Sequence, residues 1–252
     1  IEKYGKKGAD EYTKQRFLIY KQKWEKAFRF FGANNNILDV GGGNMSQENM
    51  DLVCQNAKSY TLQDIEQASL DSAKKLAEKQ NFKAIKTVNS LNTILPYKDE
   101  SFDCVFSSHC LEHSSDLAKT LFELNRVLVN EKGKIYISVP FGYDPNKCHP
   151  YILEIEDYSK LIICFGFEIV NSYISNEYPE DGYELTIEAV KVRSASKENI
   201  NIYREKINYY NKNSADIIPC ENDSRVILQS STEITKAKNL PLNAEYEIGG
   251  LI

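Results

Sequence analysis

The stretch ILDVGGGN, Ile37 to Asn44, joins a short apolar run to three consecutive glycines. The run is typical of a buried strand, and the glycines predict a tight turn before the helix expected at 47–57. Such a turn lets the backbone approach a ligand closely, and ligands of α/β sheets bind at the carboxyl ends of the strands. The G-x-G-x-x-G fingerprint of NAD-binding proteins fails, because Ser46 takes its third glycine position. Instead, Asp39 lies two residues before Gly41, where a carboxylate can orient the turn amides or meet a cationic ligand group.

Further strands and helices alternate on both sides of this stretch. An apolar stripe that includes Trp24 predicts an amphipathic helix over 10–31, and the spacing of Leu117, Leu121 and Leu124 predicts another, with Ser114 or Ser115 as its N-cap. Helix 66–80 follows the second strand, and further strands are expected at 59–63, 84–88, 103–107 and 134–140. This alternation predicts an α/β protein with a doubly wound, mostly parallel sheet.

The pattern changes after residue 140. A helix is expected at 155–164, and strands at 167–175 and 183–192 form a C-terminal antiparallel hairpin around a turn at 179–182. Residues 194–252 carry Asn, Ser and Lys with few periodic apolar runs. We expect a helix near 197–212 and an otherwise loosely structured extension that depends on a partner.

The composition is that of a globular protein, with 252 residues, 42% hydrophobic and 27% charged. A net charge of -5 gives no basic field for nucleic acid or anionic lipid. No apolar run reaches the length of a membrane helix, and residues 1–12 show no signal peptide. The six cysteines form no C-x-x-C pair, which favours buried thiols in a reducing cytoplasm.

Asp64 ends the second expected strand, 23 residues beyond Gly41. A carboxylate at this position accepts hydrogen bonds from two ribose hydroxyls, or caps the helix that begins near Glu66. Asp64 belongs to one of four stretches that resemble, in chain order, those of class I S-adenosylmethionine-dependent methyltransferases of the small-molecule branch. They are ILDVGGGN, QDIE, LPYKDESFDCVFSSHCLEH and LFELNRVLVNEKGKIYISVP, which cover about 37–140.

The resemblance implies a Rossmann-like sheet and S-adenosylmethionine as cofactor, with S-adenosylhomocysteine as product. It implies that the methionine part is held by Asp39, Gly41, Gly42 and Gly43 and contacted by Ser107 and Ser108, and that Asp64 and Ile65 hold the ribose and flank the adenine. It places Asn89, Ser90 and Leu91 at the adenine edge, although the family usually has an Asp there. It also implies a helical lid at 1–32, in which Arg16 pairs the methionine carboxylate, a methyltransferase domain at 33–193 and an extension at 194–252.

The string His109-Cys110-Leu111-Glu112-His113 spells H-x-x-E-H, a pattern of one class of zinc peptidases. That site needs both histidines on one continuous helix, but here a buried strand precedes them and a fresh helix start follows. We therefore expect a strand-to-helix bend and no metal. The alternatives at the bend are hydrogen bonds from Glu112 and His113 that fix it, or contact of His109 or His113 with cofactor or substrate.

Methyl transfer to a hydroxyl needs a general base, whereas an amine or phosphate acceptor does not. His149, in the loop after the fifth strand, and His109 are the catalytic candidates, since an unperturbed histidine pKa suits a base near neutral pH. The sequence leads us to expect a cytoplasmic O-methyltransferase of a sugar or nucleotide-linked metabolite in surface-glycan biosynthesis. A quinone, catechol or amine methyltransferase and a non-catalytic binding domain stay open, as does a homo-oligomer.

Overall fold

The computed structural model describes residues 5–43, 45–141, 153, 155–178, 182–204 and 245–247. A single eight-stranded sheet in the order β3-β2-β1-β4-β5-β7-β6-β8 runs through it. β1 (Asn35–Val40), β2 (Ala57–Asp64), β3 (Ile85–Asn89), β4 (Cys104–Ser108) and β5 (Lys134–Phe141) pair in parallel. β6 (Phe167–Tyr178), β7 (Gly182–Lys191) and β8 (Glu245–Glu247) are antiparallel. The predicted α/β sheet with a C-terminal hairpin is confirmed, and the extension adds β8 to its edge.

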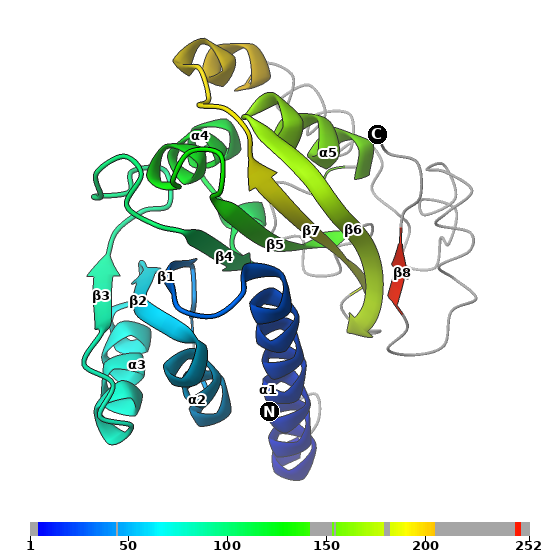
Figure 1. Ribbon diagram of the computed structural model, residues 1–252. Helices are drawn as coiled ribbons and strands as arrows, with labels where there is room; N and C mark the ends of the chain where they lie inside the picture. The colour runs from blue at the N-terminus through cyan, green and yellow to red at the C-terminus, as the bar shows by residue number, and fades with distance from the viewer. Residues whose placement is uncertain are drawn as a thin grey trace.

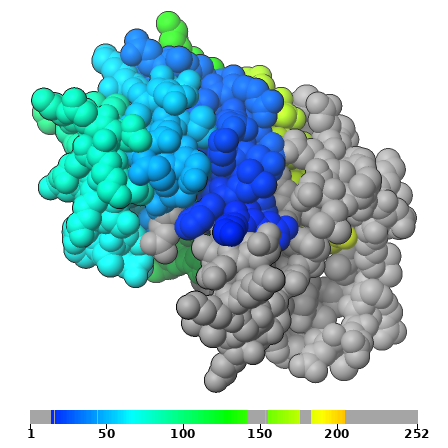
Figure 2. Space-filling view, turned by 90° about the horizontal axis from the view of Figure 1, so that it is seen from below, coloured from blue at the N-terminus to red at the C-terminus, as the bar shows by residue number. Residues whose placement is uncertain are grey.

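Helices cover both faces of the sheet (Figure 1). α1 (Gly5–Phe31), α2 (Gln47–Asn56) and α3 (Gln67–Lys79) lie on one face of the sheet. Figure 2 views the molecule from below and shows these three helices next to one another. α4 (Leu117–Val127) and α5 (Ile155–Cys164) cover the other. A further helix spans 197–204. No helix in the described part of the chain is long and apolar enough to cross a membrane.

The second half of α1 is anchored in the core. The indole of Trp24 stacks on Phe106 of β4 at 3.9 Å between ring centroids, and Phe106 stacks on Tyr136 of β5. Trp24 is 2% exposed, so its large apolar surface is almost entirely removed from water. This packing fixes the second half of α1 against β4 and β5 and brings Lys23 to the edge where the parallel strands end. The last residues of α1 lie at the opposite edge, where Lys134 at the start of β5 donates to the Phe30 carbonyl.

The N-cap of α4 differs from the prediction. Asp116 caps the helix, because its carboxylate accepts a hydrogen bond from the Lys119 N–H at 3.0 Å. Ser114 is unavailable, since its hydroxyl is buried and bonded to the Thr120 hydroxyl at 2.6 Å. A polar contact inside the fold therefore moves the cap by one or two residues.

Candidate active site

The glycine turn follows β1 at the carboxyl edge of the sheet. Gly41 and Gly43 have φ values of +72° and +49°, in the left-handed region that favours glycine. A Cβ on Gly42 would lie 2.0 Å from Leu62 Cδ1 and 2.5 Å from Asp39 Oδ2. A side chain at this position would push into these two buried residues, so glycine lets the turn pack directly on them.

Asp39 is buried under this turn. Its Oδ2 accepts a hydrogen bond from the Tyr60 hydroxyl at 2.5 Å, whereas Oδ1 has no hydrogen-bond partner among the described residues. Burial, with added repulsion from Asp64, raises the pKa of Asp39 to about 7, although the Tyr60 hydrogen bond opposes the shift. A buried carboxylate oxygen without a partner is costly, and a donor from a bound ligand would relieve that cost.

Asp64 links the end of β2 to the glycine turn. One carboxylate oxygen accepts from the Gly43 N–H at 2.9 Å and the other from the Glu66 N–H at 2.8 Å. The N-cap of α3 is Glu66, so the predicted capping role of Asp64 is wrong, although Asp64 holds the N–H of that cap residue. Its oxygens keep lone pairs for two ligand hydroxyls.

Apolar side chains stand exposed beside Asp64. Ile65 is 69% exposed and Leu91 is 53% exposed, which fits the two sides of a flat ring. The loop after β3 is held close, because the Asn89 side-chain amide donates to the Ile65 carbonyl at 2.9 Å and the Ser90 N–H donates to the Asp64 carbonyl. The predicted adenine-side residues therefore meet at one place on the edge.

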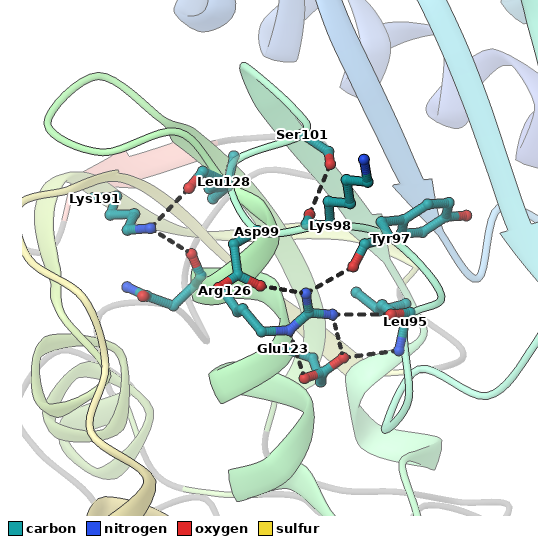
Figure 3. A network of polar contacts seen from close by, with 10 residues as sticks. Leu95, Tyr97, Lys98, Asp99, Ser101, Glu123, Arg126, Leu128 and Lys191 are labelled. Carbon is teal, nitrogen blue, oxygen red and sulfur yellow. Dashed lines mark hydrogen bonds and ion pairs between the residues drawn. The ribbon is translucent and has the colours of Figure 1, made fainter.

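Arg126 of α4 fastens the rest of the connection between β3 and β4 (Figure 3). Its guanidinium donates to the carbonyls of Leu95 and Tyr97 and to the carboxylates of Asp99 and Glu123, at 2.7 to 2.9 Å. Glu123 also accepts from the Leu95 N–H. The sequence analysis missed this residue, which sets the position of the loop that continues from Leu91.

The H-x-x-E-H string forms a bend and one 3-10 turn, η1 (Leu111–His113), and not a continuous helix. This confirms the predicted strand-to-helix bend. His109 has a φ of +52°, and its N–H donates to the Ser138 carbonyl of β5 at 2.8 Å. The next residue, Cys110, places its Sγ 2.4 Å from where a Cβ on Gly41 would be, so the bend packs directly on the glycine turn.

A charged cluster lies at the end of β4, and the sequence analysis named its residues His109 and Glu112 but neither Lys23 nor Glu184. The imidazole Nε2 of His109 lies 2.6 Å from a carboxylate oxygen of Glu184, on β7, and that oxygen also pairs with the ammonium of Lys23, on α1. Lys23 also donates to the Ser108 hydroxyl at 3.3 Å. On its other side, His109 Nδ1 lies 3.5 Å from the buried carboxylate of Glu112.

The charges of this cluster support one another. Burial raises the pKa of Glu184, but Lys23 and His109 outweigh it and hold that pKa well below its usual range. Burial and Lys23 lower the pKa of His109, yet the hydrogen bonds to Glu112 and Glu184 prevail and raise it. The cluster thus favours a charged imidazolium between two carboxylates.

The remaining predicted residues lie in three situations. Ser107 is fully buried, and its hydroxyl donates to the Val40 carbonyl at 3.3 Å. Arg16 belongs to α1, but its side chain lies outside the described residues, and so does all of His149. His113 is half-exposed, with Nε2 4.0 Å from Glu112.

The family model for a methyltransferase domain matches residues 38–137, from β1 to β5, including the glycine turn, Asp64 and the bend. The chain carries a class I methyltransferase domain. Methyltransferases of this class use S-adenosylmethionine, which supplies the methyl group when bound. The residues present fit that cofactor, because they combine an open glycine turn, a carboxylate at the end of β2 and exposed apolar side chains beside it.

Solved structures agree on the fold of this methyltransferase. The 1,6-didemethyltoxoflavin-N1-methyltransferase of Burkholderia thailandensis, solved with S-adenosylhomocysteine, is 18% identical, with a TM-score of 0.60 over 74% of this chain and 83% of that one. A SAM-dependent methyltransferase of Aquifex aeolicus is 20% identical, with a TM-score of 0.52 over 67% of this chain and 89% of that one. The [4+2]-cyclase SpnF is 16% identical, with a TM-score of 0.60 over 68% of this chain and 81% of that one, and it has this fold but a different activity. No curated protein sequence matches the chain.

Proposed function

We propose that this methyltransferase transfers the methyl group of S-adenosylmethionine to a hydroxyl of a small polar acceptor. A sugar or nucleotide-linked metabolite of surface-glycan biosynthesis is the first candidate. The observation that carries the proposal is the buried polar cluster of Lys23, His109 and Glu184, packed through Cys110 against the glycine turn. These charges already pair with one another, but the lone pairs and N–H groups that remain can bond to hydroxyl groups of an acceptor and not to an apolar one.

The cofactor would lie across the carboxyl ends of β1, β2 and β4. Asp64 would accept the ribose hydroxyls, and the unpaired Oδ1 of Asp39 would face the methionine part. Arg16 would pair the methionine carboxylate from the N-terminal helix. The remaining contacts would come from Gly41, Gly42, Gly43, Ile65, Asn89, Ser90, Leu91, Ser107 and Ser108.

Methyl transfer depends mainly on aligning the acceptor oxygen, the methyl carbon and the sulfur in a site closed to water. Because both nitrogens of His109 face carboxylates, its two N–H groups are committed to Glu112 and Glu184, and we assign it the role of positioning Glu184, whose carboxylate would accept from the acceptor hydroxyl. His149 is then the candidate general base, because an imidazole can accept a proton near neutral pH.

Calorimetry with S-adenosylmethionine and S-adenosylhomocysteine tests the cofactor site. Asp64→Ala removes two charge-assisted hydrogen bonds and should weaken binding about tenfold to hundredfold. Asp71→Ala is the matched control, since Asp71 is an exposed carboxylate of α3 that bonds only to Gln67 among the described contacts. Equal affinities for the three proteins, or no binding to the wild type, would contradict the proposal.

Turnover then tests the acceptor. S-adenosylhomocysteine release is measured with activated sugars, phenols, quinols and amines, and sugar hydroxyls should be the preferred class. Cofactor binding without turnover on any of them would instead favour a non-catalytic methyltransferase-like domain.

An amine acceptor is the second candidate, and one observation favours it. Glu112 is completely buried beside the bend, and its carboxylate lies 3.5 Å from His109 Nδ1 and 4.0 Å from His113 Nε2, both longer than a strong ion-pair hydrogen bond. An acceptor ammonium would satisfy that charge better than a neutral hydroxyl does. Glu112→Gln should then lower amine turnover far more than sugar turnover.

We also propose a cytoplasmic location and a small-molecule acceptor, without nucleic-acid or membrane binding. The division into a lid at 1–32, a methyltransferase domain at 33–193 and an extension at 194–252 remains a prediction, as does a homo-oligomer.

A further inference from the structure

Two rows of polar side chains cross the C-terminal half of the sheet on the face that α1 covers. Strand pairing places Ser108, Ser138, Thr186 and Tyr173 in one row on β4, β5, β7 and β6. The row nearer the edge contains Glu184 and its neighbour on β6, Ser175. On the same strands, the alternate residues, such as Leu185 and Ile187, point into the apolar core under α4 and α5.

These rows are buried, which is unusual for hydroxyl groups without partners. Ser138 is 0% exposed and Ser175 is 1% exposed, and neither Oγ has a hydrogen bond within the described residues. Thr186 differs, since it bonds to the hydroxyls of Tyr136 and Tyr173. A buried hydroxyl without a partner is destabilising, so two of them on the strands that flank Glu184 call for an explanation.

The rows lie on the acceptor side of the site. In the sheet order, β1 with the glycine turn lies on one side of β4, and β5, β7 and β6 lie on the other. His109 ends β4 between them and is the most exposed member of the charged cluster, with 20% of its side chain accessible. A ligand that enters at His109 would thus have the cofactor turn on one side and the polar rows on the other.

From this arrangement we propose that Ser138, Ser175 and Glu184, with Lys23 and His109, form a subsite for a neutral, polyhydroxylated group such as a sugar ring. The subsite rests on the proposed function and specifies its acceptor. Hydroxyls match it because the serines both donate and accept, Glu184 accepts, and Lys23 donates. A phosphate does not match, since the Lys23 charge is already neutralised by Glu184.

The experiment is saturation-transfer difference NMR on the full chain saturated with S-adenosylhomocysteine. The probes are the methyl glycosides of glucose, galactose, mannose and N-acetylglucosamine, with glucose 6-phosphate and tyramine as charged comparators. At least one neutral glycoside should bind, and Ser138→Ala/Ser175→Ala should weaken it about tenfold through two lost hydrogen bonds. Ser159→Ala is the matched control, because Ser159 of α5 is also buried without a hydrogen bond among the described residues but lies outside the rows.

The subsite is refuted if no glycoside binds, if the double variant binds as the wild type does, or if glucose 6-phosphate binds more tightly than the glycosides. The failure of the proposed function looks different. A glycoside that binds in the subsite without accepting a methyl group would overturn sugar methylation and leave the subsite intact. Methylation of an amine or phenol with no glycoside bound would overturn the subsite and leave methyl transfer intact.

Discussion

Replacing Arg126 by methionine should lower the free energy of unfolding by about 3 kcal/mol. The substitution keeps an unbranched side chain but removes every guanidinium donor that Figure 3 draws. The carboxylate of Glu123, which is 12% exposed, loses its cation, and the carbonyls of Leu95 and Tyr97 lose their donor. Asp99 contributes little, because its side chain is 74% exposed and water replaces the lost partner.

The magnitude follows from the burial of these partners. Breaking a buried ion pair by removing one member costs about 3–5 kcal/mol. Arg126 is 20% exposed, so water reaches part of the network and the lower end of that range applies. For a chain of this size, 3 kcal/mol corresponds to a fall in Tm of about 6–12 °C.

Urea unfolding followed by circular dichroism measures the difference. Arg204→Met is the matched control, because Arg204 pairs with Asp116 through a side chain that is 46% exposed, and it should change stability by less than about 1 kcal/mol. If Arg126→Met costs no more than the control, the guanidinium does not hold the loop between β3 and β4 and the reasoning fails.

Three further predictions concern the glycine turn, its carboxylate and α1. The pKa of Asp39, about 7, lies above its value in the unfolded chain, so the cofactor-free fold loses stability as the pH rises from about 4 to 7. Asp39→Asn lacks this loss. In urea titrations its free energy of unfolding, relative to that of the wild type, should therefore rise by about 2–3 kcal/mol between pH 5 and pH 8. Gly42→Ala should abolish binding of S-adenosylmethionine in calorimetry, because its Cβ would clash with Leu62 and Asp39. In Gly43→Ala no atom lies closer than 3.9 Å to the new Cβ, so this variant should only lower the free energy of unfolding by about 1–2 kcal/mol, the cost of its positive φ. Trp24→Ala should cost about 3–5 kcal/mol in urea unfolding, and Phe17→Ala, on the exposed side of α1, less than about 1; similar losses would contradict the anchoring of α1.

The cofactor side of the site was predictable because its signals are local. A short apolar run, a glycine turn and an acidic residue after the next strand follow one another within about 30 residues, and parallel strands bring their carboxyl ends to one edge. Asp39, Gly41 and Asp64 therefore fall together in the structure as the sequence implied. The bend at His109 was predictable for the same reason, since a buried strand and a helix start leave few residues between them.

The acceptor side was not predictable, because its contacts join distant parts of the chain. Lys23 and Glu184 are 161 residues apart, and each looks like an ordinary surface charge in its own segment. In YELTIEAV, the alternation of Glu184, Thr186 and Glu188 with apolar residues is what a strand with one solvated face shows. Only the position of β7 between β5 and β6, under α1, turns that polar face inward.

That inward polar face bears on how the fold was selected. A buried Lys23–Glu184 pair is weak evidence for stability, since well-packed apolar side chains of similar size are often as stable or more so. The first half of the same face, under α1 to α3, is indeed apolar and contains Trp24 and Phe106. The change from an apolar to a polar interior occurs at β4, the strand whose end separates the cofactor turn from the polar rows. A protein that needed only a stable core would have no reason to make this change, so the polar half is better explained by the molecule that receives the methyl group.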